Sequence, residues 1–369
     1  MYVDIDILQT VPPSNLNRDD TGSPKTAIYG GERRARVSSQ AWKKATRDAF
    51  RATLDPATLG IRTKKSVEMI AERIAAQAPE FEESAQELAV AVLGTANIKS
   101  APPKNNKAGV PETGSLVFFS ALQVNHLASL AITSARTGEE VTKQEAKQAA
   151  DTDHSIDLAL FGRMVAEAPD LNVDASAQVA HAISVHAVDN EFDYFTAVDD
   201  RAPEDSAGAG MIGTVEFNSA TLYRYATVNI AALATSLGSN VATVAALTEF
   251  IRAFALSMPT GKQNTFANRT LPDALIVTLR NRQPLNLSGA FENAVSADAN
   301  RSRLQVAAER LAAHKQSSEN AFDQSPVASF VVRVGDTTAA LDKSGDVVEF
   351  DELLHRVRAL VSEYLGGVS

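Results

Sequence analysis

The chain has 369 residues, no cysteine and a formal net charge of −10 at pH 7. This length can form one large hydrophobic core or two ordinary ones, and the composition is that of a globular protein. The lack of cysteine excludes disulfides, iron–sulfur clusters, zinc ribbons and thiol nucleophiles. No secretory signal pattern is seen, and the longest apolar stretch, Gly114 to Ala135, carries polar residues that favour a buried helix over a membrane span. We therefore expect a cytoplasmic protein with no membrane partner.

The first segments predict a strand followed by a long loop. Residues 2–11 alternate apolar and polar side chains, which predicts a half-buried strand ended by Pro12 and Pro13. Residues 14–31 are rich in Asn, Asp, Gly and Pro and are too long for a simple connector, so they are a functional candidate. Residues 33–37 are expected to form a short strand.

A basic helix is predicted next, because Ser38 and Ser39 are good N-cap residues followed by helix formers. At about 100° per residue, its polar and basic side chains share one narrow stripe. The residues of that stripe are Gln40, Lys43, Lys44, Arg47 and Arg51. The opposite side of the helix carries Ala41, Trp42, Ala45 and Ala49.

The charge around this helix suits a polyanion. Between Lys25 and Arg47 there are seven Lys and Arg and one acid, Glu32, a local net charge of +6 in an acidic chain. Because binding follows the local field, such a stripe can hold a phosphate backbone; the alternative is a solvated helix face. The candidates for phosphate contact are Lys25, Arg33, Arg34, Arg36, Lys43, Lys44 and Arg47, with Ser38 and Gln40 as neutral donors.

The middle of the chain, from about residue 64, is predicted to be largely helical. A buried helix is expected from Ser115, and another over residues 174–188, capped by Asp174 or Ser176. Strands are expected to return near Asn190, and residues 194–221 contain a glycine-rich excursion with an apolar tip.

The last third mixes helices and strands. Helices are predicted over 241–258, 289–297, 304–315 and 351–365, and strands over 274–279 and 329–334. Because strands flank the helical block, the pattern predicts one discontinuous α+β domain with a large insertion.

Catalytic motifs are weak by comparison. Asp19–Asp20 and Asp199–Asp200 could hold Mg²⁺, but adjacent Asp residues are more often turn formers, and Arg18 and Arg201 lie beside them. His181 and His186 lie five apart, on different faces of a predicted helix, so a shared metal is not expected. We expect a binding module with no catalytic residue, no metal and no cofactor.

Five segments give a specific resemblance. NLNRDD, AIYGGERRARVSSQAWKKA, HAISVHAVDNEFDYFTAVDD, GTVEFNSATLYRYATVN and PTGKQNTFA, in this order, resemble the CasC-type crRNA-binding backbone subunit of type I-E CRISPR Cascade, a member of the RAMP superfamily. The resemblance implies a modified RRM-like (ferredoxin-like) palm in residues 1–59, 182–193 and 222–369. It also implies a helical fingers insertion in 60–181 and a protruding thumb in 194–221.

The resemblance also implies partners and residue roles. Copies would stack head to tail along one crRNA, which pairs with a target DNA strand, beside CasA, CasB, CasD and CasE types of subunit. Guide-backbone contacts fall on Lys25, Ser38, Gln40, Lys43, Lys44 and Arg47, with close approach at Gly30 and Gly31. Further palm contacts fall on Lys262, Gln263 and Asn264. Base wedges fall on Met164, Phe195 and Ile212, and candidate DNA contacts on Lys143 and Lys147.

Two alternatives remain open at this point. Related backbone subunits in type III complexes use an aspartate to cut paired RNA, so a metal-dependent ribonuclease using Asp19 and Asp20 is the first. A protein-only assembly module is the second.

Overall fold

The computed structural model describes residues 1–197, 211–298 and 300–366, and the chain forms two compact units. The first unit comprises Met1–Ala49, Val179–Val228 and Thr248–Tyr364, and the second comprises Phe50–Gln178, Asn229–Leu247 and Leu365–Ser369. Among the described residues, no helix is both long and apolar enough to cross a membrane. The protein belongs to the α+β class, with a large and mainly antiparallel sheet.

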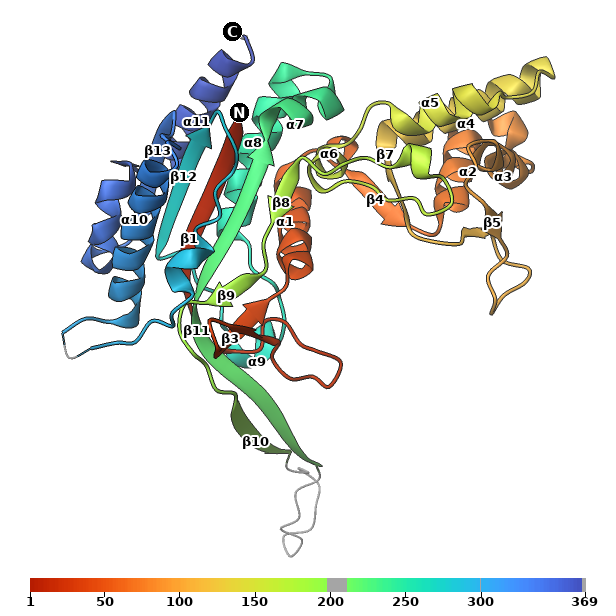
Figure 1. Ribbon diagram of the computed structural model, residues 1–369. Helices are drawn as coiled ribbons and strands as arrows, with labels where there is room; N and C mark the ends of the chain where they lie inside the picture. The colour runs from red at the N-terminus through yellow and green to blue at the C-terminus, as the bar shows by residue number, and fades with distance from the viewer. Residues whose placement is uncertain (198–210, 299, 367–369) are drawn as a thin grey trace, which may run out of the picture. The chain divides into compact units, whose positions relative to one another are not determined.

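The first unit is built on this sheet (Figure 1). The strand order is β14-β13-β12-β1-β11-β9-β3-β2, and β10 pairs with β11. β12 is antiparallel to both β1 and β13, whereas β14 runs parallel to β13. The strands are β1 (Tyr2–Ser14), β2 (Thr26–Tyr29), β3 (Glu32–Val37), β9 (Ala182–Ser184), β10 (Glu191–Ala197), β11 (Met211–Asn229), β12 (Ala274–Arg280), β13 (Ala328–Arg333) and β14 (Asp346–Val347).

Helices cover both faces of the sheet. One face carries α10 (Arg303–Ala321) and the 3-10 segments η4 (Leu287–Phe291) and η5 (Asp336–Ser344), whose apolar residues share a core with Tyr223 and Tyr225 of β11. Arg224 points to the other face because side chains alternate along a strand. There it meets α1 (Ser39–Thr53) and the end of α8 (Asn240–Leu256). Arg252 of α8 in turn lies 3.5 Å from Asp351 of α11 (Phe350–Tyr364).

The covered sheet changes the interpretation of β1. The predicted half-buried strand is wrong, since Asp4 and Asp6 are 0% and 2% exposed and their apolar neighbours Ile5 and Ile7 are also fully buried. The strand also continues through Pro12 and Pro13 to Ser14 instead of ending at the first proline. Alternation in the sequence located the strand but could not show that α10 covers its polar face.

The second unit is mainly helical, with short strands. Its apolar core joins the helices α2, α3, α4 and α5. α4 begins with a capping box between Ser120 and Gln123 and ends at Gly138 in the left-handed conformation. The helices of the second unit are α2 (Ser66–Gln77), α3 (Ala85–Thr95), α4 (Ala121–Thr137), α5 (Lys143–Asp151), α6 (Ile156–Phe161) and α7 (Ile230–Leu237). The short strands of the segment from 60 to 179 are β4 (Gly60–Thr63), β5 (Ser100–Ala101), β6 (Glu112–Thr113), β7 (Val117–Ser120) and β8 (Ala177–Val179).

Three helix predictions need correction. The helix expected from Ser115 begins only at Ala121, because Val117–Ser120 forms β7 and pairs with β4. The helix expected over 174–188 is wrong: this segment forms β8 and β9. The helix expected over 289–297 is reduced to the 3-10 segment η4. The predicted strands at 33–37, 274–279 and 329–334 and helices at 241–258, 304–315 and 351–365 are confirmed to within a few residues at most ends, α10 running on to Ala321.

Candidate nucleic-acid interface

Helix α1 has the predicted two-sided character. Ser38 caps it, since the Ala41 N–H donates to the Ser38 hydroxyl at 3.3 Å. Trp42 is buried, whereas Gln40 and Lys44 are exposed. The first turns of the helix therefore present a polar and cationic front over an apolar back.

The cations on this front differ in their surroundings. Lys43 is half-buried, and burial lowers the pKa of its ammonium group from the ordinary value. Lys44 is exposed and lies 2.5 Å from Asp48, one turn further along the helix. Because an exposed ion pair at this spacing contributes only about 0.3–0.5 kcal/mol, a phosphate could compete with Asp48 for Lys44.

The long loop after β1 is fixed to the start of α1. The backbone N–H of Ser38 donates to the Asn17 side-chain oxygen at 2.9 Å, and the N–H of Lys25 donates to the Asn17 carbonyl at 2.9 Å. The N–H of Arg36 donates to the Lys25 carbonyl at 2.9 Å. These bonds bring Lys25 and Arg36 to the N-terminal end of α1, where the helix dipole also favours an anion.

His181 also lies at the helix start, although the sequence offered no motif for it. Its Nδ1 accepts a hydrogen bond from the Ser39 N–H at 3.3 Å. Its pKa is lowered by partial burial and by the nearby charges of Arg36 and Lys25. The neutral imidazole therefore satisfies a free helix N–H while its second nitrogen remains a donor.

The GKQNT segment, residues 261–265, is held against the long loop after β1. A Cβ at Gly261 would overlap the carbonyl oxygen of Leu16, so only glycine allows this close approach. Lys262 follows with φ +50°, and the short helix α9 (Gln263–Phe266) begins after it. Lys262 and Gln263 are half-buried and Asn264 is exposed. The structure thus brings the predicted palm residues of three separate segments into one region.

The glycine pair has two different roles. Gly30 has φ +58°, and a Cβ there would overlap the carbonyl oxygen of Glu292, so glycine is required by packing within the chain. Gly31 has φ +81°, and none of the surrounding atoms lies within 4 Å of the position that a Cβ would take. Its open side therefore remains free for the predicted close approach of a ligand.

Arg34 is a correction to the list of phosphate candidates. Its side chain is fully buried and donates at 3.0 Å to the carbonyls of Ser184, Phe291 and Glu292. A guanidinium committed to three internal carbonyls stabilises the fold and is not available to a phosphate. Arg34 lies in a basic run of the sequence, which could not show that its side chain packs against β9 and η4.

β10 and the first part of β11 form a hairpin that extends beyond the rest of the sheet (Figure 1). Phe195 pairs with Gly213, and its ring occupies the space that a side chain at Gly213 would fill. Ile212 pairs with Thr196 through the backbone, but its side chain lies outside the described part of the structure, as do residues 198–210.

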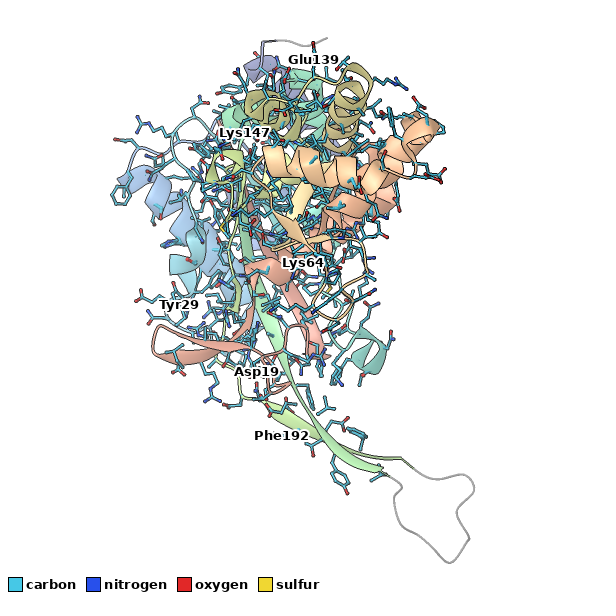
Figure 2. All side chains as sticks on the ribbon, turned by 90° about the vertical axis from the view of Figure 1, so that its right-hand side faces the viewer. Asp19, Tyr29, Lys64, Glu139, Lys147 and Phe192 are labelled. Carbon is cyan, nitrogen blue, oxygen red and sulfur yellow. The ribbon has the colours of Figure 1, made fainter. Side chains whose placement is uncertain are left out.

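Two exposed aromatic residues on this hairpin were missed by the sequence analysis. Phe192 and Tyr194 are 66% and 62% exposed, compared with 37% for Phe195. They share one face of β10, opposite to Phe195, and Figure 2 shows Phe192 on the hairpin. The alternation in the segment EFDYF could have identified this face.

The family of the chain follows from its similarity to known proteins over nearly its whole length. The model of the Cas family described as CT1975-like protein matches residues 3–356. The chain belongs to this family. No curated protein matches it.

Two solved structures have the same fold as this CT1975-like protein. One, described as "CRISPR RNA-guided surveillance complex, pre-nicking", is 32% identical with a TM-score of 0.86, and the match covers 98% of this chain and 100% of that one. Another, described as "CRISPR RNA-guided surveillance complex", is 28% identical with a TM-score of 0.62, covering 98% and 99% of the two chains.

In this CT1975-like protein, Asp19 has a structural role in the loop. Its Oδ1 accepts from the Thr21 N–H at 2.9 Å, the Thr21 hydroxyl at 2.7 Å and the Ser23 N–H at 3.0 Å. These bonds lower the pKa of the exposed Asp19 carboxyl. Across the described residues, no three His, Asp or Glu side chains are placed to hold a metal ion. Asp199 and Asp200 lie outside the described residues.

The remaining predicted residues belong to the second unit. Met164 is 75% exposed, and its role as a base wedge stays a prediction. Lys147, labelled in Figure 2, forms an ion pair with Asp170. Lys143 is exposed at the first turn of α5, and Glu139, Glu140 and Glu145 are close to it in the sequence. Acidic neighbours therefore weaken the field of both lysines, and their assignment to DNA stays a prediction.

Proposed function

We propose that this protein is a non-catalytic backbone subunit of a CRISPR surveillance complex, in which copies polymerise along crRNA. The observation that carries the proposal is the cationic front of α1. Lys25, the long loop after β1 and the GKQNT segment are held around the N-terminus of this helix. The likeness to chains of RNA-guided surveillance complexes, over the full length of those chains, supports a role in crRNA-guided interference.

The proposal extends to architecture and partners. The sheet with β1, β11 and β12 at its centre would be the RRM-like palm, the second unit would supply the helical fingers, and the β10–β11 hairpin would be the thumb. The partners would be crRNA, the target DNA strand, further copies of the chain and the other subunits of a type I-E complex.

In the proposed mechanism, the protein holds the guide by its backbone. Lysine and arginine side chains would contact phosphates, which carry no sequence information, and the helix dipole at the start of α1 would favour these anions. Specificity would then be left to base pairing between guide and target. The protein would accept any guide sequence for this reason.

The hairpin would act on a neighbouring copy. Phe195 would wedge against a base and interrupt the stack, at a cost of a few kcal/mol for each unstacked step. The apolar contact of the wedge would offset part of that cost and leave the guide in short, ordered segments ready for pairing.

The first test is RNA binding by a charge-reversed α1. We expect Lys43→Glu/Arg47→Glu to abolish binding of a labelled single-stranded RNA, measured by fluorescence anisotropy, because the front of the helix would repel phosphates. Lys343→Glu/Arg358→Glu changes the net charge equally at two exposed residues away from α1 and should bind as the wild type does. Unchanged affinity in the α1 variant, with its circular dichroism intact, would refute the proposed site.

The second test addresses catalysis. We expect no cleavage when the protein, loaded with guide RNA, is incubated with complementary RNA and Mg²⁺, because Asp19 is engaged in its own turn. Regularly spaced cleavage that disappears in Asp19→Ala and Asp20→Ala would establish a metal-dependent ribonuclease instead.

A further inference from the structure

Four arginine side chains are almost completely buried in the described part of the chain. They are Arg34, Arg163, Arg224 and Arg280. Arg163 has Asp151 at 2.7 Å, and Arg280 has Asp4 at 2.9 Å. In the described part of the chain Arg34 forms no ion pair: it donates to three backbone carbonyls, and the negative charge of Glu32 acts on it from a longer distance. Two of the four buried charges therefore have an acid in direct contact, as is usual for buried ions, and a third has one nearby.

Among the described residues, Arg224 is held by neutral groups alone. Its guanidinium lies 3.7 Å from the ring centre of Trp42 and 4.6 Å from that of Phe254. It donates to the Gln9 side-chain oxygen at 2.5 Å and to the Phe254 carbonyl. No acidic side chain of the described residues forms an ion pair with it. Burial lowers the pKa of Arg224 to about 9, so the side chain remains charged at neutral pH.

This uncompensated charge lies behind the basic front of α1. Trp42 belongs to the first turn of the helix, where the dipole already contributes positive charge. A buried charge is screened by salt much less than an exposed one, and its field extends further through the protein interior. Arg224 therefore adds to the positive potential that Lys43 and Lys44 create in front of the helix.

We propose that Arg224 is a positioning residue for the nucleic-acid face. Its guanidinium seats α1 by stacking on Trp42, and its counter-ion is a phosphate bound on the far side of the helix. This inference rests on the proposed function, because it requires a polyanion at α1. It assigns the buried arginine to ligand binding as well as to packing, although Arg224 itself touches no ligand.

The test separates charge from packing with three variants. Arg224→Met removes the charge and keeps most of the volume. Arg224→Lys keeps the charge and loses the planar stack. Gln9→Glu keeps the arginine and gives it a carboxylate partner at the position of the present amide. Affinity for a labelled single-stranded RNA is measured by fluorescence anisotropy for each, with Arg163→Lys as a matched change at a compensated arginine.

We expect Arg224→Met and Gln9→Glu each to weaken RNA binding on the order of tenfold, the effect of one charge acting across a helix about 10 Å thick at an effective dielectric of about 20. Arg224→Lys should stay within about threefold of the wild type, as should the Arg163 control. The Gln9 variant neutralises Arg224 and keeps its stack on Trp42, although it loses the hydrogen bond that the Gln9 amide donates to the Thr270 carbonyl. It still reports if the Met variant does not fold.

Equal binding by the wild type and Gln9→Glu would overturn the inference, as would a Lys variant as weak as the Met variant. In both cases RNA binding by the wild type would leave the proposed function in place. If the wild type itself binds no RNA, the proposed function fails, and this inference fails with it.

Discussion

Asp4 and Asp6 place two carboxyl groups on the face of β1 that α10 covers. The Tyr223 hydroxyl donates to Asp6 at 2.6 Å and the Tyr225 hydroxyl donates to Asp4 at 2.9 Å. Arg280 lies 2.9 Å from Asp4. Burial, followed by the negative charge of Asp4, raises the pKa of Asp6 from 3.8 to about 7.

This pKa predicts a pH dependence of stability. A carboxyl whose pKa is raised by folding stabilises the native state below its unfolded value near 4, and this stabilisation is lost as the pH rises through about 7. A shift of about three units corresponds to at most about 4 kcal/mol. We expect the free energy of unfolding of the wild type, relative to Asp6→Asn, to fall by up to that amount between pH 4.5 and 7.5 in urea titrations.

The matched control for this prediction is Asp189→Asn, at an exposed position. Its free energy of unfolding should follow that of the wild type at every pH. Parallel curves for the wild type and Asp6→Asn would show that Asp6 does not bind its proton more tightly in the folded state.

At the scale of elements, local signals predicted α1 well. Capping by Ser38, a cationic stripe and an apolar back are properties of the helix itself, so the sequence was enough. The helix expected over 174–188 failed because its small and β-branched residues fit either period, and pairing of β9 with β3 and β11 decided the outcome. Long-range pairing of this kind leaves little local trace.

The candidate site, like the fold, could be predicted from the sequence only where the signal is local. The basic residues of α1 and the GKQNT segment could be named from local sequence, but the hydrogen bonds that bring them together could not. His181 gains its place at the helix start only because β9 pairs beside β3. Arg34 and Arg224 resemble other arginines in the sequence, and only the packing around the sheet shows that both are buried.

For the whole molecule, the charge distribution bears on assembly. The chain carries a net charge of −10, so copies of it repel one another, while the basic front of α1 attracts a polyanion. The contact proposed between the hairpin of one copy and the next copy is heterologous, and a contact of this type that does not close generates an open filament. RNA bound by several copies would both offset this repulsion and set the length of the filament.

We therefore expect assembly to be templated by RNA. With single-stranded RNAs of two lengths, one twice the other, the mass of the complex measured by light scattering should rise in proportion to RNA length. The complexes should dissociate on nuclease treatment and at high salt, because phosphate contacts weaken steeply with ionic strength.

Phe192→Ala/Tyr194→Ala tests the hairpin and should reduce the number of copies bound to each RNA while leaving the binding of a single copy to a short RNA unchanged. An oligomer of fixed size that survives nuclease would instead indicate a protein-only assembly, in which attraction between copies exceeds the repulsion of their acidic surfaces.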